Sequence, residues 1–414
     1  MRVAFVADVH VGNHRRFGGP AWRSMNVRCR LAVDVFTRAV ERVVDLECDA
    51  LVVLGDLLDS DRPEPQIITA IHDALRVAHE AGVQVFLLVG NHDQTSNVPG
   101  DNALHALAPF ARIVDSPEVI RLDKPRWPLA GKTGPAAARV RDRVDIFCVP
   151  FSPEPAEGWL RLSIPGMVAS LGEEAGGGPD GVPPRLLAVH MGVRDASTAK
   201  WLSGARDAID IDPLLDLCRI HGIQRVFAGN WHDRRRWEFF MTEGCPVEGA
   251  GEVFQLGALV PTGFDNPGLT GYGTLAVWDS HHPASGRAPE VEAEELPGPR
   301  FIVHSDDDLT HILDANKPLG NKLFVSWTVG SDELVGCTEV LSTLREQGLV
   351  IDGEVLADQG EIEAAARTAA HAARSARGLD DALDAFVAHM RLDEGVDRAA
   401  VLARARGYLV KGEA

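Results

Sequence analysis

One stretch decides the fold, LVVLGDLLD at residues 51–59. It opens with four apolar residues and a glycine follows, which is typical of a buried strand in a sheet covered on both faces. The turn after this strand brings Asp56 to the carboxyl end of the strand, where open α/β sheets bind their ligands. Taken alone, Asp56 also fits a turn residue that caps the next helix. Further strands that end in the same way would favour ligand binding.

Four other apolar stretches end in Asp, His or Asn. They cover residues 2–7, 83–89, 186–189 and 225–229. The polar side chains at their ends are Asp8, His10, Asn91, His92, Asp93, His190, Asn230 and His232. A single Asn-His after a strand is more often a turn or a cap, but the repetition of such ends argues against that explanation. Because the carboxyl ends of parallel strands meet at one edge of a sheet, we expect these side chains to converge.

These residue types indicate a particular chemistry. Nitrogen and oxygen donors without cysteine suit manganese, iron or zinc. Two metal ions about 3.5 to 4 Å apart activate water and stabilise the phosphoryl oxygens as charge develops on them. Asp56 is the carboxylate best placed to bridge two such ions. The sequence therefore predicts a two-metal centre that hydrolyses a phosphoester.

Composition limits the class of protein. The length of 414 residues allows two or three domains, and 45% hydrophobic with 24% charged residues is ordinary for a soluble globular protein. No apolar run reaches about 18 residues, so we expect no membrane span, and the strand at residues 2–7 leaves no room for a signal peptide. Six cysteines without a C-x-x-C pair favour reduced thiols in the cytoplasm. The net charge of −19 argues against coating of nucleic acid through bulk positive charge, but it allows an enzyme with local arginines.

Such arginines follow the first strand. The loop after His10 contains Arg15, Arg16 and Arg23, with Trp22 among them. They are explained equally well as a solvated loop or as a patch that contacts the phosphates of DNA.

The chain divides into four regions by composition. Residues 1–280 alternate strands and helices, and the Pro/Glu-rich stretch 281–299 is the expected linker. Residues 300–358 form a strand-helix-strand pattern that predicts a small α/β cap. Residues 359–414 are helical and amphipathic, either packing on the chain's own core or docking a partner. The apolar positions of this C-terminal segment are Leu383, Phe386, Val387, Met390, Val401, Leu402 and Leu409.

The ordered series D-x-H, G-D, G-N-H-D, H and G-x-x-H resembles the calcineurin-like metallophosphoesterase superfamily over roughly residues 1–280. Gly55-Asp56 through Asp59, followed by Arg62-Pro63-x-Pro65, resembles its SbcD-type DNA repair nuclease branch, bacterial or phage. The resemblance implies an α/β fold, a four-layer αββα sandwich, with a DNA-facing cap domain and a C-terminal helical segment. That segment would bind an SbcC-like ABC ATPase, and homodimers are common in the branch.

The resemblance also implies roles for the residues at the strand ends. One metal ion would be held by Asp8, His10, Asp56 and His232, and the other by Asp56, Asn91 and His190. Manganese is the expected ion, with magnesium, iron or zinc as alternatives. His92 would protonate the leaving oxygen or stabilise the phosphate, and Asp93 would orient His92.

One position departs from the family. The family pattern ends in Gly-His-x-His, and Asn230 replaces the first histidine. An amide oxygen can ligate a hard cation, which would shift the preference toward manganese or magnesium. Alternatively, the second metal ion binds weakly at this site.

Three functions remain open. The first is a manganese-dependent DNA exonuclease or endonuclease subunit that works with an ATPase. The second is a phosphodiesterase or phosphatase that acts on small nucleotides or phosphoproteins, which the charge of −19 favours. The third is a binding subunit whose catalysis has weakened at Asn230 and which keeps its DNA or partner contacts.

Overall fold

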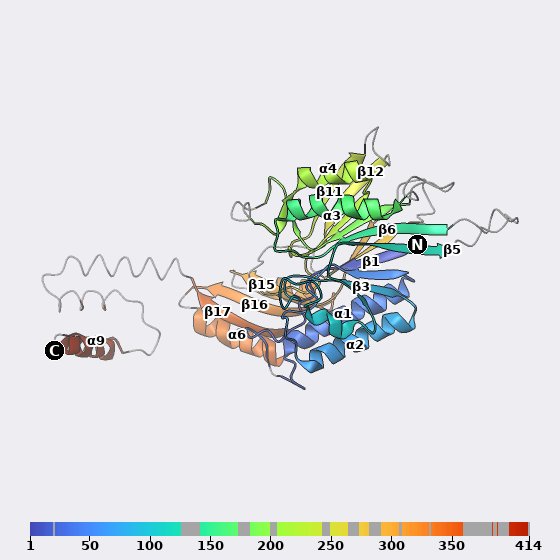
Figure 1. The fold of residues 1–414 in the computed structure, drawn as a ribbon. Helices are drawn as coiled ribbons and strands as arrows, with labels where there is room; N and C mark the ends of the chain where they lie inside the picture. The colour runs from blue at the N-terminus through green and yellow to red at the C-terminus, as the bar shows by residue number, and fades with distance from the viewer. Residues whose placement is uncertain are drawn as a thin grey trace. The chain divides into compact units, whose positions relative to one another are not determined.

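The chain folds into two compact units, Met1–Arg300 and Phe301–Ala414, in a computed structural model (Figure 1). The structure describes residues 1–19, 21–125, 141–172, 183–198, 205–241, 249–263, 273–280, 291–305, 309–330, 333–358, 383, 387 and 397–412.

The first unit contains two six-stranded sheets. The first sheet has the strand order β14-β13-β1-β2-β3-β4. Strands β1, β2, β3 and β4 are parallel, whereas β13 pairs antiparallel with β1, and β14 pairs antiparallel with β13 at the edge. The strands are β1 (Arg2–Val6), β2 (Ala50–Val53), β3 (Gln84–Leu88), β4 (Arg112–Val114), β13 (Thr274–Asp279) and β14 (Val291–Glu295).

The second sheet has the order β11-β12-β10-β7-β6-β5. Its four inner strands are parallel, and both edge strands are antiparallel to their neighbours. The strands are β5 (Glu118–Pro125), β6 (Arg141–Val149), β7 (Arg185–Val189), β10 (Arg225–Ala228), β11 (Arg235–Met241) and β12 (Gly249–Gln255).

Alternation along the strands sorts the side chains into three apolar layers. In β1, Ala4 and Val6 pack with helices α1 (Val27–Asp45) and α2 (Pro65–Glu80). Val3 and Phe5 point the other way and pack against the second sheet. There the rings of Phe5 and Phe227 stack with centroids 3.7 Å apart. Successive side chains of a strand point to opposite faces of the sheet, so a strand buried between a helix layer and a second sheet is apolar on both faces.

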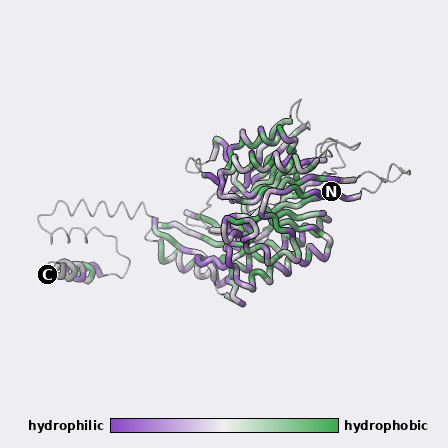
Figure 2. The backbone as a smooth tube through the Cα atoms, in the orientation of Figure 1, coloured by the Kyte–Doolittle hydropathy of each residue, from purple (hydrophilic) through white to green (hydrophobic). Residues whose placement is uncertain are grey.

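The far face of the second sheet is covered by helices α3 (Ala156–Ser170) and α4 (Ile211–His221). The first unit is therefore a four-layer αββα sandwich, and the predicted fold class is confirmed (Figure 1). Hydrophobic residues concentrate along its central strands (Figure 2). Two short strands, β8 (Gly192–Arg194) and β9 (Ala208–Asp210), pair beside this core, and a 3-10 helix, η1 (Ala103–Leu107), follows β3 in the chain.

The stretch expected to be a linker, residues 281–299, differs from the expectation. Residues 291–295 form β14, whose Val291 is buried and pairs with Trp278. The remaining residues of β14 are exposed, which an edge strand tolerates and which its glutamates require. Residues 281–290 lie outside the described part of the chain.

The second unit contains a three-stranded sheet in the order β15-β16-β17. Its elements are β15 (Pro299–His304), α5 (Thr310–Asn316), β16 (Lys322–Val329), α6 (Leu334–Glu346) and β17 (Val350–Ala357). Strands β16 and β17 are parallel with α6 between them in the chain, and Trp327 and Leu341 lie in their common core.

Helix α9 (Arg398–Gly412) ends the described part of the C-terminal segment. It carries Val401 and Leu402, and Val387 before it is buried. Most of the predicted segment at 359–396, including Phe386 and Met390, lies outside the described residues. Among the helices described, none has the length and apolar character needed to span a bilayer.

Candidate metal centre

The chain bends sharply where the ligand-bearing strands end. Asp8, His10, Asp56 and Asn230 have positive φ angles of 51°, 49°, 49° and 76°. Asn, Asp and His adopt this left-handed conformation more readily than most side chains, although it is still uncommon for them. Such outliers cluster at functional sites, where the surrounding structure holds them. These four residues lie just beyond the ends of β1, β2 and β10.

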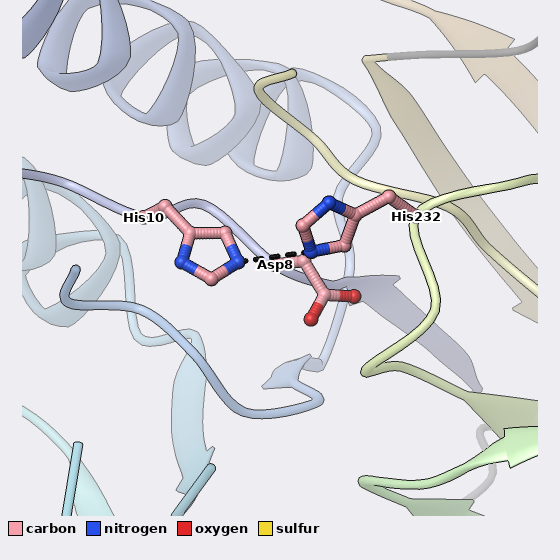
Figure 3. A group of neighbouring side chains, drawn as sticks. All are labelled: Asp8, His10 and His232. Carbon is pink, nitrogen blue, oxygen red and sulfur yellow. Dashed lines mark hydrogen bonds between the residues drawn. The ribbon is translucent and has the colours of Figure 1, made fainter. Parts of the chain in front are cut away.

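The first cluster joins Asp8, His10 and His232, whose candidate ligand atoms all lie within 4.8 Å of one another (Figure 3). The Nε2 atoms of His10 and His232 are 3.1 Å apart. Asp56 reaches the same place, because one of its carboxylate oxygens lies 3.8 Å from Nε2 of His10.

The second cluster joins Asp8, Asp56 and His190, again within 4.8 Å. Nδ1 of His190 donates a hydrogen bond of 2.6 Å to the carbonyl oxygen of Leu54, which directs Nε2 into the pocket. There Nε2 lies 3.5 Å from an oxygen of Asp56 and 3.0 Å from Oδ1 of Asn91. Since Asp8 and Asp56 border both clusters, the two form one pocket.

Burial governs the electrostatics of this pocket. It raises the pKa of Asp8 to about 8, although the neighbouring His190 acts in the opposite direction. Burial alone would lower the pKa of His190, but the charges of Asp56 and Asp8 and the hydrogen bonds to Asp56 and Leu54 together outweigh it and raise that pKa to about 9. For Asp56, burial would raise the pKa, but the charges of His190, His10 and His92 and the hydrogen bond from His190 together lower it. Burial lowers the pKa of His10, and that of His232 to about 4.

These donors fit divalent cations. Two buried carboxylates share the pocket with the rings of His10 and His232, whose lowered pKa values leave them neutral, the form in which imidazole binds a metal ion. Imidazole nitrogens with carboxylate and amide oxygens are the ligand set that manganese, iron or zinc accepts. When bound, two divalent cations would neutralise charge on a phosphoryl group and activate a water molecule.

His92 lies at the exposed mouth of the pocket. Its ring is 4.8 Å from that of His10, centroid to centroid, and its Nδ1 donates a hydrogen bond of 3.1 Å to the carbonyl oxygen of Asp59. Its backbone N–H donates to Asp56 at 2.9 Å. The ring therefore has one nitrogen held by the protein and the other available to a substrate.

The expected contact between Asp93 and the ring of His92 is wrong. Asp93 is buried, and its two carboxylate oxygens accept from the backbone N–H groups of Leu58 and Gly90 at 3.0 and 2.9 Å. Asp93 thus ties the ends of β2 and β3 together. Asp59, through its carbonyl oxygen, is the residue that orients His92.

Asn230 contributes through both its backbone and its side chain. Its backbone N–H lies 3.0 Å from each carboxylate oxygen of Asp8. Its side-chain Nδ2 donates to the carboxylate of Asp207 at 2.9 Å. Because a carboxylate can only accept, Asp207 determines which end of the amide faces it.

Sequence analysis missed Asp59, His14 and Asp207 as members of the site. The carboxylate of Asp59 lies 3.7 Å from Nδ1 of His10 and 3.5 Å from Nδ1 of His14, and burial raises its pKa to about 6. Asp59 closes the stretch 51–59, so its place three residues after Asp56 was an available signal. Asp207 has no such signal, since only the pairing of β8 with β9 brings it to Asn230.

The three predicted DNA-contacting arginines, Arg15, Arg16 and Arg23, are exposed on the loop after His10. Arg28, which follows them, is buried and donates to the carbonyl oxygens of Arg16 and Thr262 at 2.8 and 2.5 Å. Arg28 therefore links the loop to Thr262 through these two hydrogen bonds.

The fold and the pocket define a class of protein. The sequence profile described as calcineurin-like phosphoesterase matches residues 1–234, more than half of the chain. The chain therefore belongs to the calcineurin-like phosphoesterase family, and the predicted superfamily is confirmed.

Within that family, the chain is similar to archaeal proteins named DNA double-strand break repair protein Mre11. It is 34% identical to the one from Methanopyrus kandleri over 95 residues, which cover 22% of this chain and 19% of the relative. It is 23% identical to the one from Methanocaldococcus jannaschii over 123 residues, 30% of this chain and 32% of the relative. The matches thus span no more than about a third of each relative.

Solved structures resemble the chain more loosely. A dimetal phosphatase from Danio rerio superposes with a TM-score of 0.37 and 13% identity, covering 67% of this chain and 91% of its own. The protein TT1561 of Thermus thermophilus superposes with a TM-score of 0.38 and 10% identity. The match covers 71% of this chain and 98% of TT1561.

Proposed function

We propose that this protein is a metal-dependent DNA nuclease, the catalytic subunit of an SbcCD-like repair complex. The observation that carries the proposal is the convergence of five strand ends on one pocket, where Asp8 belongs to both clusters of carboxylates and imidazoles. The similarity to the Mre11 proteins supports DNA as the substrate.

The proposed ligands divide between two cations. Asp8, His10, Asp56 and His232 hold the first, and Asp56, Asn91 and His190 hold the second, where Asn230 also contributes its amide oxygen. Asp8 lies close enough to Asp56 and His190 to serve the second cation as well. Manganese is the proposed ion, because it accepts this mixture of nitrogen and oxygen donors.

His92 is the proposed proton donor to the leaving oxygen. Its Nδ1–H is held by the carbonyl oxygen of Asp59, so a second proton on Nε2 would be the one transferred. His92 is exposed beside His10, where a scissile phosphate would lie within reach of both the pocket and the solvent. Positioned proton transfer of this kind contributes about 10²- to 10⁴-fold to a rate.

The experiment compares two substrates in Mn²⁺, a DNA hairpin with a 3′ end and a small chromogenic phosphodiester. We expect the chain to cleave both, and the His92→Gln variant to lose about 10²- to 10⁴-fold on DNA while binding the same number of metal ions. Hydrolysis of the small diester without any cleavage of DNA would contradict the nuclease and favour an enzyme for small nucleotides or phosphoproteins. The net charge of −19 is what favours that second function.

A third possibility rests on Asn230, whose amide N–H is engaged by Asp207. If the purified chain holds a single metal ion and cleaves neither substrate, it is instead a binding subunit with weakened catalysis. The SbcC-like ABC ATPase remains the proposed partner, with the C-terminal helical segment as its docking site. We also propose a cytoplasmic location and DNA contacts from Arg15, Arg16 and Arg23.

A further inference from the structure

A two-residue hairpin projects from the loop after His10. Backbone hydrogen bonds of 2.8 and 3.1 Å join Trp22 and Met25 in both directions. The two residues between them, Arg23 and Ser24, have φ angles of 49° and 63°. Turns of this kind are normally filled by Asn-Gly or Asp-Gly, which adopt positive φ at little cost. A strained turn that presents particular side chains is a reason to look for a function in them.

The hairpin is fixed to the metal pocket through two asparagines. Asn13 donates to the carbonyl oxygen of Ser24 at 2.7 Å and accepts from the backbone N–H of Asn26 at 2.9 Å. The side chain of Asn26 in turn donates to the carbonyl oxygen of His14, at 2.7 Å. His14 itself contacts the carbonyl oxygen of His10 at 3.2 Å. The position of the hairpin therefore follows the position of a proposed metal ligand.

Trp22 is 54% exposed, which is unusual for so large an apolar side chain, and the Arg23 guanidinium lies 4.4 Å above its ring. Beside the hairpin is a hollow of about 320 Å³, within the size range of small-ligand sites. It is lined by Trp22, Met25, Val27, Leu31, Val33 and Arg30. Asp34 completes the lining and offers an acceptor to a ligand's amino group.

We propose that Trp22 and this hollow hold an unpaired nucleobase of a DNA strand. An aromatic face beside arginines is the arrangement that binds single-stranded nucleic acid, because every base has a face that can stack and the arginines meet the phosphates. The positive charge is local, in a chain of net charge −19, and so complements an anionic strand at this place. The inference rests on the proposed function and adds that the substrate has unpaired nucleotides next to the cleaved bond.

The test measures DNA binding by the full chain, with Ca²⁺ replacing Mn²⁺. One probe is a hairpin with a 3′ single-stranded overhang that carries 2-aminopurine, and the other is a blunt duplex of the same stem. We expect Trp22→Ala to weaken binding of the overhang by about 5- to 150-fold and to abolish the quenching of 2-aminopurine that stacking causes. Binding of the blunt duplex should change less than about twofold, since all of its bases are paired.

Two variants serve as controls. Trp22→Phe keeps an aromatic face and should retain most of the affinity and the quenching. Phe240→Ala removes an aromatic side chain that is 72% exposed on β11 of the second sheet, and it should change neither. Hydrolysis of the small chromogenic diester by Phe240→Ala should also equal that of wild type, because Phe240 lies outside the proposed binding site and is not among the proposed metal ligands.

Equal binding of the overhang by wild type and Trp22→Ala would overturn the inference. An equal loss of affinity for the overhang and the blunt duplex would also overturn it, because Trp22 would then contribute to contacts with the DNA backbone and not to stacking on a base. If wild type quenches 2-aminopurine but does not cleave DNA in Mn²⁺, the nuclease function fails and the base-binding site stands. If it cleaves DNA and Trp22→Ala behaves as wild type, only the base-binding site fails.

Discussion

Two glycines decide how closely the ligand-bearing turns approach one another. A Cβ atom on Gly55 would lie 2.2 Å from Nδ1 of His190, and one on Gly90 would lie 2.1 Å from Oδ1 of Asp56. Gly55 also has a φ of 93°. Either Cβ would displace a side chain that borders the pocket. At the scale of single residues, the centre depends on these two positions as much as on the donors themselves.

Asp207 offers a residue-scale prediction. Its carboxylate takes the Nδ2 end of Asn230, which leaves the amide oxygen for a cation. In Asp207→Asn the new amide can either donate or accept, so both orientations of Asn230 become possible. We expect one of two Mn²⁺ ions to bind about 10- to 100-fold more weakly, as measured by isothermal titration.

The matched control is Asp212→Asn, the same chemical change at an exposed position in the first turn of α4. It should bind both ions as the wild type does. Unaltered binding of both ions by Asp207→Asn would show that Asn230 is not held for the metal in this way.

At the scale of elements, Asp195 joins the end of β8 to β11. One carboxylate oxygen accepts from the indole N–H of Trp237 at 2.8 Å, and the other accepts from the Ser197 hydroxyl at 2.6 Å. Arg235 adds an ion pair at 3.3 Å. Burial by itself would raise the pKa of Asp195, but these hydrogen bonds and the ion pair bring it down to about 2.

We expect Asp195→Asn to lower the free energy of unfolding by roughly 1 to 2 kcal/mol at pH 7. Because the pKa of Asp195 is lower in the folded state, its stabilisation is fully present above its ordinary pKa of 3.8 and is lost as the pH falls toward 2. Urea unfolding of wild type and variant should therefore differ at pH 7 and converge between pH 4 and 2. A difference that is constant over this range would mean that the charge of Asp195 contributes nothing.

At the scale of the whole molecule, the metal pocket lies where two sheets meet. Asp8, Asp56 and Asn91 follow strands of the first sheet, whereas His190 and His232 follow strands of the second. A ligand bound to all of them would hold the layers together. It would also stabilise the folded chain, since the unfolded chain does not bring these groups into one place.

We therefore expect Mn²⁺ at about 100 times its dissociation constant to stabilise the chain by roughly 2.7 kcal/mol, and EDTA to reverse the shift in melting temperature. Asp8→Asn should lose most of this shift. Asp73→Asn, an exposed change on α2, should keep it. The two-metal centre would be contradicted if the melting temperature of wild type were the same in Mn²⁺ and in EDTA.

The C-terminal segment gives a second prediction at this scale. Deletion of residues 359–414 should abolish capture of an SbcC-like ATPase, because the amphipathic helices would be its docking site. Hydrolysis of the small diester should persist, since every proposed metal ligand lies in the first unit. Loss of both properties together would mean that the segment packs on the chain's own core.

The strands and the turns that follow them could be predicted from the sequence, because both depend on residues that are close together in the chain. Each apolar stretch that precedes a polar residue, such as Leu51–Leu54 before Asp56, contains most or all of a strand in the structure. Continuous apolar runs and short turns depend on residues adjacent in the chain. Six of the side chains at the strand ends, Asp8, His10, Asp56, Asn91, His190 and His232, meet in one pocket, and the resemblance implied the four layers.

Only the tertiary structure decided which groups meet across long separations. Asp93 contacts backbone N–H groups instead of the ring of His92, Asp207 reaches Asn230, and residues 291–295 pair as an edge strand. The physical reason is that hydrophobic periodicity specifies the face a residue turns to the core, whereas hydrogen-bond partners depend on how separate segments pack. The sequence by itself determined the strands and the donors that end them, and packing determined the partners of each donor.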